Sequence, residues 1–111
     1  MEYIVVFITT PNEEEAAKIG RALVEEMLAA CVNVVRSVRS IYRWQGKIED
    51  EAEALMVVKT RLALFDRLSQ RVRALHSYSV PEIIAFPIRQ GSPEYLKWLA
   101  DATSEGEAGA P

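Results

Sequence analysis

The chain has 111 residues, enough for one domain with a substantial core but too few for two. Half of the residues are hydrophobic, 26% are charged and the formal net charge is −3, which excludes the basic surface typical of nucleic-acid binding. No run approaches the roughly 18 apolar residues of a membrane helix, and the start lacks the basic residues of a signal peptide. The only cysteine, Cys31, excludes an internal disulfide and paired-cysteine zinc sites and favours the cytoplasm.

The first predicted elements are a strand and a helix. Residues 3–8 are almost entirely apolar, as in a central strand buried on both faces. In "TPNE", we expect Thr10 as the N-cap, Pro11 as the first helical residue and Glu13 as the partner in a capping box. Apolar residues at three- and four-residue spacing then predict a helix of about five turns that covers a sheet. These residues are Ala16, Ile19, Leu23, Met27 and Ala30.

The rest of the chain predicts a long hairpin, a second helix, a last strand and a short helix. Residues 31–44 and "ALMVVKT" at 54–60 form the hairpin strands around the turn "QGK" at 45–47. Apolar spacing predicts a helix from 62 to about 76, and "VPEIIAFPI" at 80–88 is typical of a strand. "SPEYLKWLADA" at 92–102 begins with a serine cap and a proline, so it predicts a helix. Residues 1–102 are expected to form one domain, and 103–111 a mobile tail.

This order predicts an α+β, ferredoxin-like βαββαβ fold with a short C-terminal helix, in which an antiparallel sheet carries two helices on one face. Residues 3–8 are apolar on both sides, and hairpin strands of this length would reach about 40 Å, more than the width of such a domain. Exposed apolar sheets and strand edges promote association. We therefore expect an obligate oligomer.

Several motifs are specific in combination: "TTPNEEEA" at 9–16, "LAACVNV" at 28–34, "SIYRWQGKIEDEAEALMVVKT" at 40–60, "HSYSVPEII" at 76–84 and "YLKWL" at 95–99. Together they resemble the CutA-type divalent-cation tolerance proteins. The resemblance implies a tight homotrimer, with sheets facing inward and long hairpins reaching into neighbouring subunits. It also implies binding of copper and other divalent cations.

Two places depart from the family's usual pattern. Ser77 and Ser79 stand on either side of Tyr78, where the family has a proline and an acidic or amide residue, so a carboxylate beside His76 is missing. Ile8 occupies the position at which some members have a cysteine. A copper site built on that cysteine is therefore excluded.

The candidate metal ligands are His76, Glu82 and Glu53. Imidazole together with carboxylates suits copper, zinc or nickel, and copper is favoured over zinc because it binds most tightly to nearly any nitrogen and oxygen site. Glu82 follows His76 by six residues, and Glu53 lies in the acidic run "EDEAE" at 49–53. Each residue also has a structural alternative. His76 could be an imidazole that bonds the carbonyls at a helix end, Glu82 a charge at the rim, and Glu53 part of a solvated strand edge.

A cleft between subunits is the second candidate site. Lys59, Tyr78 and Trp44 could line it. Tyr42 and Trp44 are two residues apart on one strand, so they share a face and are expected at the trimer interface. Cys31 is expected to be a small buried hydrophobe and not a nucleophile.

The sequence favours a trimeric divalent-metal (copper-type) binding or tolerance protein that is not an enzyme and has no organic cofactor. The alternative is a small-molecule-sensing signalling module with its ligand in clefts between subunits, by analogy of architecture. A phosphate-processing enzyme is disfavoured because the loop "TTPNEEE" is acidic and has no glycine. RNA recognition is disfavoured because the sheet lacks the aromatic pairs it needs.

Overall fold

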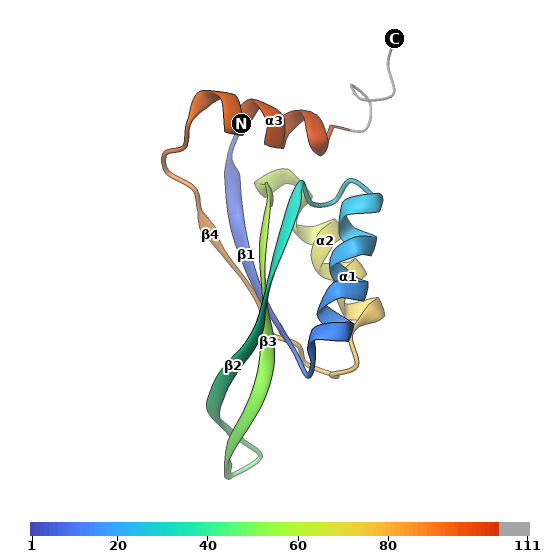
Figure 1. The fold of residues 1–111 in the computed structure, drawn as a ribbon, viewed down its shortest axis with the longest axis vertical. Helices are drawn as coiled ribbons and strands as arrows, with labels where there is room; N and C mark the ends of the chain where they lie inside the picture. Colours follow the sequence, from blue (N-terminus) through green and yellow to red (C-terminus); the bar gives the residue numbers. More distant parts are fainter. Residues whose placement is uncertain (105–111) are drawn as a thin grey trace.

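The computed structural model describes residues 1–104 as a four-stranded antiparallel sheet with two helices, α1 and α2, packed together on one face (Figure 1). Helix α3 lies across the end of the sheet near the N-terminus. This is the predicted α+β, ferredoxin-like order of elements. No helix within residues 1–104 is long and apolar enough to cross a membrane. The elements are β1 (Tyr3–Thr10), α1 (Glu13–Glu25), β2 (Cys31–Trp44), β3 (Lys47–Arg61), the short 3₁₀ helix η1 (Leu62–Leu64), α2 (Phe65–Leu75), β4 (Ile83–Pro87) and α3 (Pro93–Ala102).

Strand β1 lies inside the sheet, whose order is β2-β3-β1-β4. Val6 therefore pairs with Val58 of β3 on one side and with Ala85 of β4 on the other. Alternate residues of β1 are buried, and the residues between them are only half-buried on the opposite face. The prediction of an internal strand is confirmed, whereas its second face is only partly covered by the described residues. The core includes Ile4, Val6, Ile8, Ile19, Leu23, Met56, Val58, Leu68 and Val72.

Helix α1 begins two residues later than predicted. Asn12, and not Thr10, is the N-cap, because its side-chain oxygen accepts the backbone N–H of Glu15 at 2.8 Å. Thr10 is instead the last residue of β1, and its hydroxyl donates to the carbonyl of Asn12 at 2.7 Å. The predicted five turns are also too many. Helix α1 ends at Glu25, and Met27 adopts a left-handed φ of 59° that turns the chain toward β2.

The hairpin is the longest feature of the molecule, which measures 53 × 27 × 22 Å (Figure 1). Strand β1 pairs with β3 only from Arg61 back to Ala54. Residues 47–53 of β3 consequently pair with β2 alone and extend past the helices. At the tip, Gln45 and Gly46 have φ values of 49° and 80°, as a tight turn matched to the twist of two strands requires.

The C-terminal helix is held by its two ends. Ser92 caps α3 by accepting the N–H of Tyr95, and Pro93 occupies the first turn, as the sequence predicted. At the other end, Arg61 donates to the hydroxyl and the carbonyl of Thr103 at 2.9 and 2.6 Å. Thr103 and Ser104 are therefore buried and hydrogen-bonded, unlike a mobile tail. The rest of the predicted tail, 105–111, lies outside the described residues.

Gly20 allows α1 to approach β2 closely. A Cβ atom at this position would lie 3.1 Å from a methyl group of Val32. We expect Gly20→Leu to destabilise the protein by about 1–3 kcal/mol through overpacking, measured as a lower urea midpoint. Ala17→Leu, on the exposed face of the same helix, is the matched control and should change stability by about 0.5 kcal/mol or less. Equal midpoints for the two variants would contradict this close contact.

Candidate functional site

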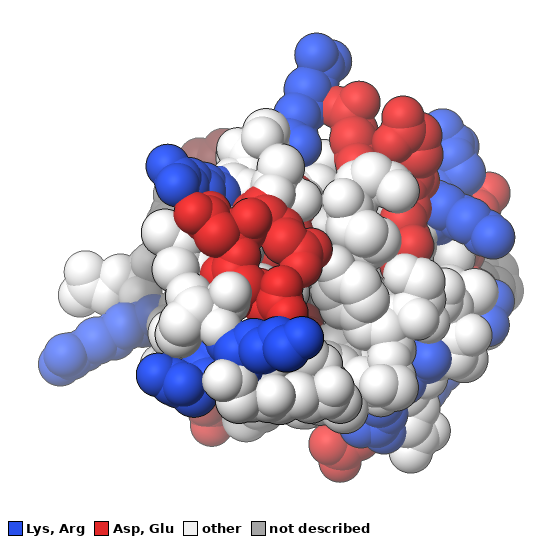
Figure 2. Space-filling model, turned by 90° about the horizontal axis from the view of Figure 1, so that it is seen from below, with Lys and Arg blue, Asp and Glu red and all other residues white. Residues whose placement is uncertain are grey.

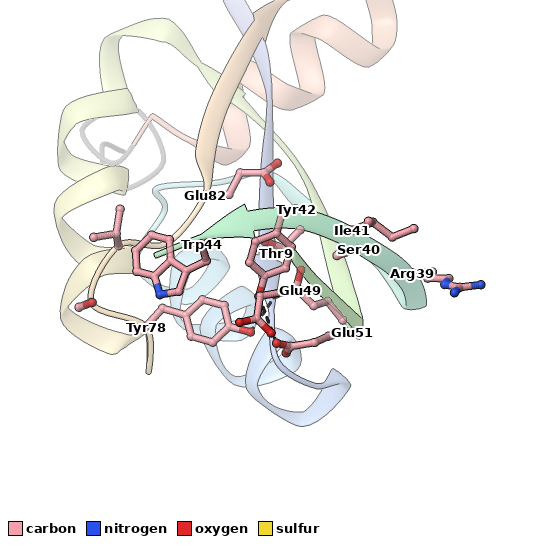
Figure 3. Close-up of a pocket in the computed structure, with 13 residues that line it drawn as sticks. Thr9, Arg39, Ser40, Ile41, Tyr42, Trp44, Glu49, Glu51, Tyr78 and Glu82 are labelled. Carbon is pink, nitrogen blue, oxygen red and sulfur yellow. Dashed lines mark hydrogen bonds between the residues drawn. The ribbon is translucent and has the colours of Figure 1, made fainter. Parts of the chain in front are cut away.

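A cavity of about 740 Å³ lies where the hairpin leaves the sheet (Figure 3). Its walls come from the end of β1, the overhanging parts of β2 and β3, and the loop between α2 and β4. Within residues 1–104, the lining combines four glutamates and three aromatic residues with a single basic residue, Arg39. The glutamates are Glu49, Glu51, Glu53 and Glu82, and the aromatic residues are Tyr42, Trp44 and Tyr78.

The alternation of β3 places its glutamates in the cavity. Glu49, Glu51 and Glu53 are separated by single residues, so their side chains leave the strand on the same face. Asp50 is not part of the lining and makes two hydrogen bonds with Arg39, at 2.8 and 2.7 Å. These bonds lower the pKa of Asp50. Arg39 is thus already paired, and in Figure 3 its guanidinium points away from the aromatic rings.

Two tyrosines donate hydrogen bonds to these carboxylates. The Tyr78 hydroxyl lies 2.9 Å from Glu53 Oε2, and the Tyr42 hydroxyl lies 3.3 Å from Glu51 Oε1. Burial, followed by the hydrogen bond and the charge of Glu53, raises the pKa of Tyr78. Burial and the charge of Glu51 likewise raise the pKa of Tyr42. Both hydroxyls therefore keep their protons at neutral pH and orient the carboxylates as hydrogen-bond donors.

Glu82 enters the cavity from the loop before β4. Burial first, and the nearby charge of Glu53 second, raise the pKa of Glu82. The folded chain consequently binds the Glu82 proton more tightly than the unfolded chain does. Stability from this group is therefore present at low pH and is lost as the pH rises through its titration range. The charge of Glu53 thus disfavours ionisation of Glu82, and a positive charge near the two carboxylates would favour it.

Acidic side chains also gather on the outer surface at this end of the molecule. Figure 2 shows a compact acidic group surrounded by uncharged side chains, with basic side chains beside it. No group of three His, Cys, Asp or Glu side chains in residues 1–104 converges closely enough to hold a metal ion by itself. The predicted ligands Glu53 and Glu82 share the cavity, but two carboxylates would be only part of a coordination shell.

His76 is not brought together with the two predicted carboxylate ligands. Its side chain is 0% exposed, and its Nδ1 accepts the backbone N–H of Tyr78 at 3.0 Å. A backbone N–H can only donate, so Nδ1 must be the ring nitrogen without a proton. Nε2 therefore carries the proton and donates to the Thr9 carbonyl at 2.7 Å. Glu15 lies 3.4 Å from Nδ1 and accepts bonds from Ser77. Both ring nitrogens are thus used, and the imidazole holds the Tyr78 loop to the end of β1.

Lys59 and Cys31 also lie apart from the cavity. Neither residue is part of its lining. The two residues pair across β3 and β2, and Lys59 donates to the side chain of Asn33. Lys59 and Tyr78 therefore do not share this cavity, and their grouping in a cleft between subunits stays a prediction. Cys31 is half-buried rather than fully buried, and its Sγ lies 3.7 Å from Asn33 Oδ1.

Tyr42 and Trp44 both line the cavity, which agrees with the prediction that they share one strand face. No motif in the sequence had pointed to Glu49 and Glu51 as site residues. Their alternation in "EDEAE" was the available signal. To assign these glutamates to a site, one must know that residues 47–53 extend beyond β1. Only beyond β1 does this face of β3 meet the loop between α2 and β4.

The fold and the cavity define a ferredoxin-like domain with an extended hairpin and an acidic, aromatic hollow at its base. The sequence model described as CutA1 divalent ion tolerance protein matches residues 4–102. The chain is 56% identical over 99 residues to the divalent-cation tolerance protein CutA of Thermus thermophilus, covering 89% of this chain and 96% of that protein. Human protein CutA is 48% identical over 97 residues, covering 87% of this chain and 54% of that one.

Solved structures agree with this assignment. A Thermus thermophilus divalent cation tolerance protein superposes with a TM-score of 0.89 at 54% identity, covering 91% of this chain and 98% of that one. CutA1 from Oryza sativa superposes with a TM-score of 0.91 at 45% identity, covering 95% and 96%. The chain therefore belongs to the CutA1 divalent ion tolerance protein family. It spans about half the length of its human relative and nearly all of the Thermus one.

We expect His76→Ala to lower the free energy of unfolding by about 2–4 kcal/mol. The substitution leaves the Tyr78 N–H without its acceptor and opens a void at a fully buried position. Urea unfolding measures this loss. A His76→Ala variant as stable as the parent would contradict the structural role of the imidazole.

Proposed function

We propose that the protein binds divalent cations without catalysing a reaction, and that the cation binds in the acidic cavity at the base of the hairpin. The observation that carries this proposal is the pair Glu53 and Glu82. Their carboxylates share one hollow, and burial followed by the charge of Glu53 raises the pKa of Glu82. The basic residue of the lining, Arg39, is paired with Asp50. A cation placed between the two carboxylates would remove their repulsion.

The donor atoms fit hard divalent cations better than copper. Carboxylate and water oxygens suit Mg²⁺ and Mn²⁺, and Mg²⁺ commonly binds through one or two carboxylates while it keeps several waters. Glu53 and Glu82 would supply such carboxylates. The predicted copper preference rested on the general order of divalent-metal affinities. Its nitrogen ligand would be His76, whose ring nitrogens are both engaged in hydrogen bonds. Copper binding through that imidazole would require the Tyr78 loop to open.

We also propose that the protein is a homotrimer. Apolar side chains on the sheet face away from α1 and α2 support association, because monomers seldom expose large apolar patches. Ile84 and Phe86 are 46% and 45% exposed on β4, and the hairpin carries further exposed apolar residues. Tyr42 and Trp44 lie on that hairpin, where a neighbouring subunit could contact them.

A binding role fits the separation of the two reactive side chains. Cys31 contacts Asn33, whereas His76 is buried between Thr9 and Tyr78, so no thiol and imidazole form a catalytic pair in residues 1–104. We propose a cytoplasmic location on the basis of the unpaired Cys31 thiol.

Isothermal titration of the metal-free protein with MnCl₂, CuCl₂ and ZnCl₂ tests the cation site. We expect Glu53→Gln and Glu82→Gln each to weaken Mn²⁺ binding about tenfold, because each removes a carboxylate charge beside the ion. Glu14→Gln is the matched control: it causes the same change in net charge at an exposed position outside the cavity. The affinity of the parent should rise with pH as Glu82 loses its proton.

Two results would contradict the cation site. One is equal Mn²⁺ affinity in Glu82→Gln and Glu14→Gln. The other is a defined copper stoichiometry that disappears only in a correctly folded His76→Ala variant, which would move the site to the imidazole.

Light scattering after size-exclusion chromatography tests the assembly. We expect a mass three times that of the 12.5 kDa subunit, and dissociation when Phe86→Asp places a charge on the open face of β4. Val24→Asp is the control, because Val24 is similarly exposed at 42% but lies on α1. Circular dichroism would verify that both variants fold. A folded Phe86→Asp protein that keeps the full mass would rule out this face as the interface.

The size of the cavity favours a second candidate, the small-molecule-sensing module. A hollow of about 740 Å³ falls within the range of organic ligand sites, roughly 300–1,000 Å³. An organic ligand and a metal ion could compete for the same carboxylates.

A further inference from the structure

We propose that His76 is a pH-sensitive latch: the neutral imidazole holds the loop between α2 and β4 closed, and protonation of the imidazole releases it. The latch consists of contacts inside one chain and does not depend on the proposed cation site. The side chain of His76 is buried where the end of β1, the first turn of α1 and this loop meet. It is the only histidine of the chain, and histidine is the side chain whose charge ordinarily changes between about pH 5 and 8.

In the neutral state, both ring nitrogens have a matched partner. Nδ1 accepts the backbone N–H of Tyr78 at 3.0 Å, and Nε2 donates to the carbonyl of Thr9 at 2.7 Å. The ring thereby joins the loop to β1. In an imidazolium, both nitrogens are donors, so a proton on Nδ1 would point at the N–H of Tyr78. Two donors cannot bond each other, and the hydrogen bond that closes the loop is lost.

Glu15 provides an alternative partner for the protonated ring. Its Oε2 atom, on α1, lies 3.4 Å from Nδ1, slightly farther than a charge-assisted hydrogen bond requires. Oε2 also accepts the backbone N–H and the hydroxyl of Ser77 at 2.9 and 3.0 Å, which fix its position. Nδ1 is therefore next to one donor and one acceptor. The N–H of Tyr78 suits the neutral ring, and the carboxylate of Glu15 suits the protonated ring.

The other groups around the ring do not respond to pH in this range. Strand β1 presents the backbone carbonyl of Thr9, and the loop presents the ring of Tyr78, whose centroid lies 4.8 Å from that of the imidazole. Burial and the bond to Glu53 raise the pKa of Tyr78, so its hydroxyl stays protonated. Strand β3 contributes Glu53 only through this hydroxyl, at 2.9 Å. Within residues 1–104, Glu15 is thus the charged side chain paired with the imidazole.

Nuclear magnetic resonance of the intact, metal-free, ¹⁵N-labelled protein tests the latch. Because the chain has one histidine, its ring nitrogens give the protonation state directly. We expect a neutral ring with the proton on Nε2 at about pH 8 and an imidazolium at about pH 5.5. Hydrogen exchange of the Tyr78 amide, corrected for the intrinsic effect of pH, should accelerate about tenfold or more over the same range. The amide of Val6, in the centre of the sheet, should stay protected.

Glu15→Gln tests the alternative partner. The amide keeps an oxygen that can accept from Ser77 but loses the charge that stabilises the imidazolium, so both the ring titration and the release of the Tyr78 amide should move to lower pH. Glu14→Gln is the matched control, because it removes the same charge from an exposed neighbouring position, and it should leave both transitions in place.

Several results would overturn the latch. One is a ring that titrates while the corrected exchange of the Tyr78 amide stays constant, and another is a ring that stays neutral to about pH 5 in the folded protein. Loss of protection at Val6 together with Tyr78 would show global unfolding instead of local release. Equal transitions in Glu15→Gln and Glu14→Gln would remove Glu15 as the partner of the protonated ring. None of these results depends on whether the protein binds Mn²⁺.

Discussion

Strand β3 determines the architecture because one continuous strand belongs to the core of the sheet at one end and to the overhanging hairpin at the other. From Ala54 to Arg61 it pairs with both β1 and β2, whereas residues 47–53 pair with β2 alone. The two-residue repeat continues through this boundary, so one pleated surface carries apolar side chains into the core and another carries glutamates into the hollow. The cavity forms because the hairpin extends beyond the sheet at the place where the loop between α2 and β4 lies against it.

The loop between α2 and β4 is held by a chain of hydrogen bonds, and the central group of the chain, the His76 ring, is buried. The carbonyl of Thr9 accepts from His76, His76 accepts from the backbone of Tyr78, and the hydroxyl of Tyr78 donates to Glu53. The histidine therefore supports the cavity through Tyr78 without being part of its lining. The cost of such an arrangement is a buried carboxylate close to Glu82, and a bound cation would relieve it.

The sequence predicted the elements well because their signals are local. Apolar period, the proline and serine that open α3, and the turn residues at 45–47 each identify an element without tertiary information. The predicted N-cap of α1 was wrong because threonine and asparagine are both good N-caps. Thr10 still belongs to β1, so the cap falls on Asn12. The site was harder to predict, since the contacts of His76 with Thr9 and of Tyr78 with Glu53 span 67 and 25 residues.

The most direct test of the central claim is anomalous diffraction from crystals of the assembled protein grown with Mn²⁺. We expect one anomalous peak per chain in the cavity at the base of the hairpin, within bonding distance of carboxylate oxygens of Glu53 and Glu82, with the His76 ring still bonded to Thr9 and Tyr78. A peak on the His76 ring, or ordered Mn²⁺ only at the acidic first turn of α1, would contradict it.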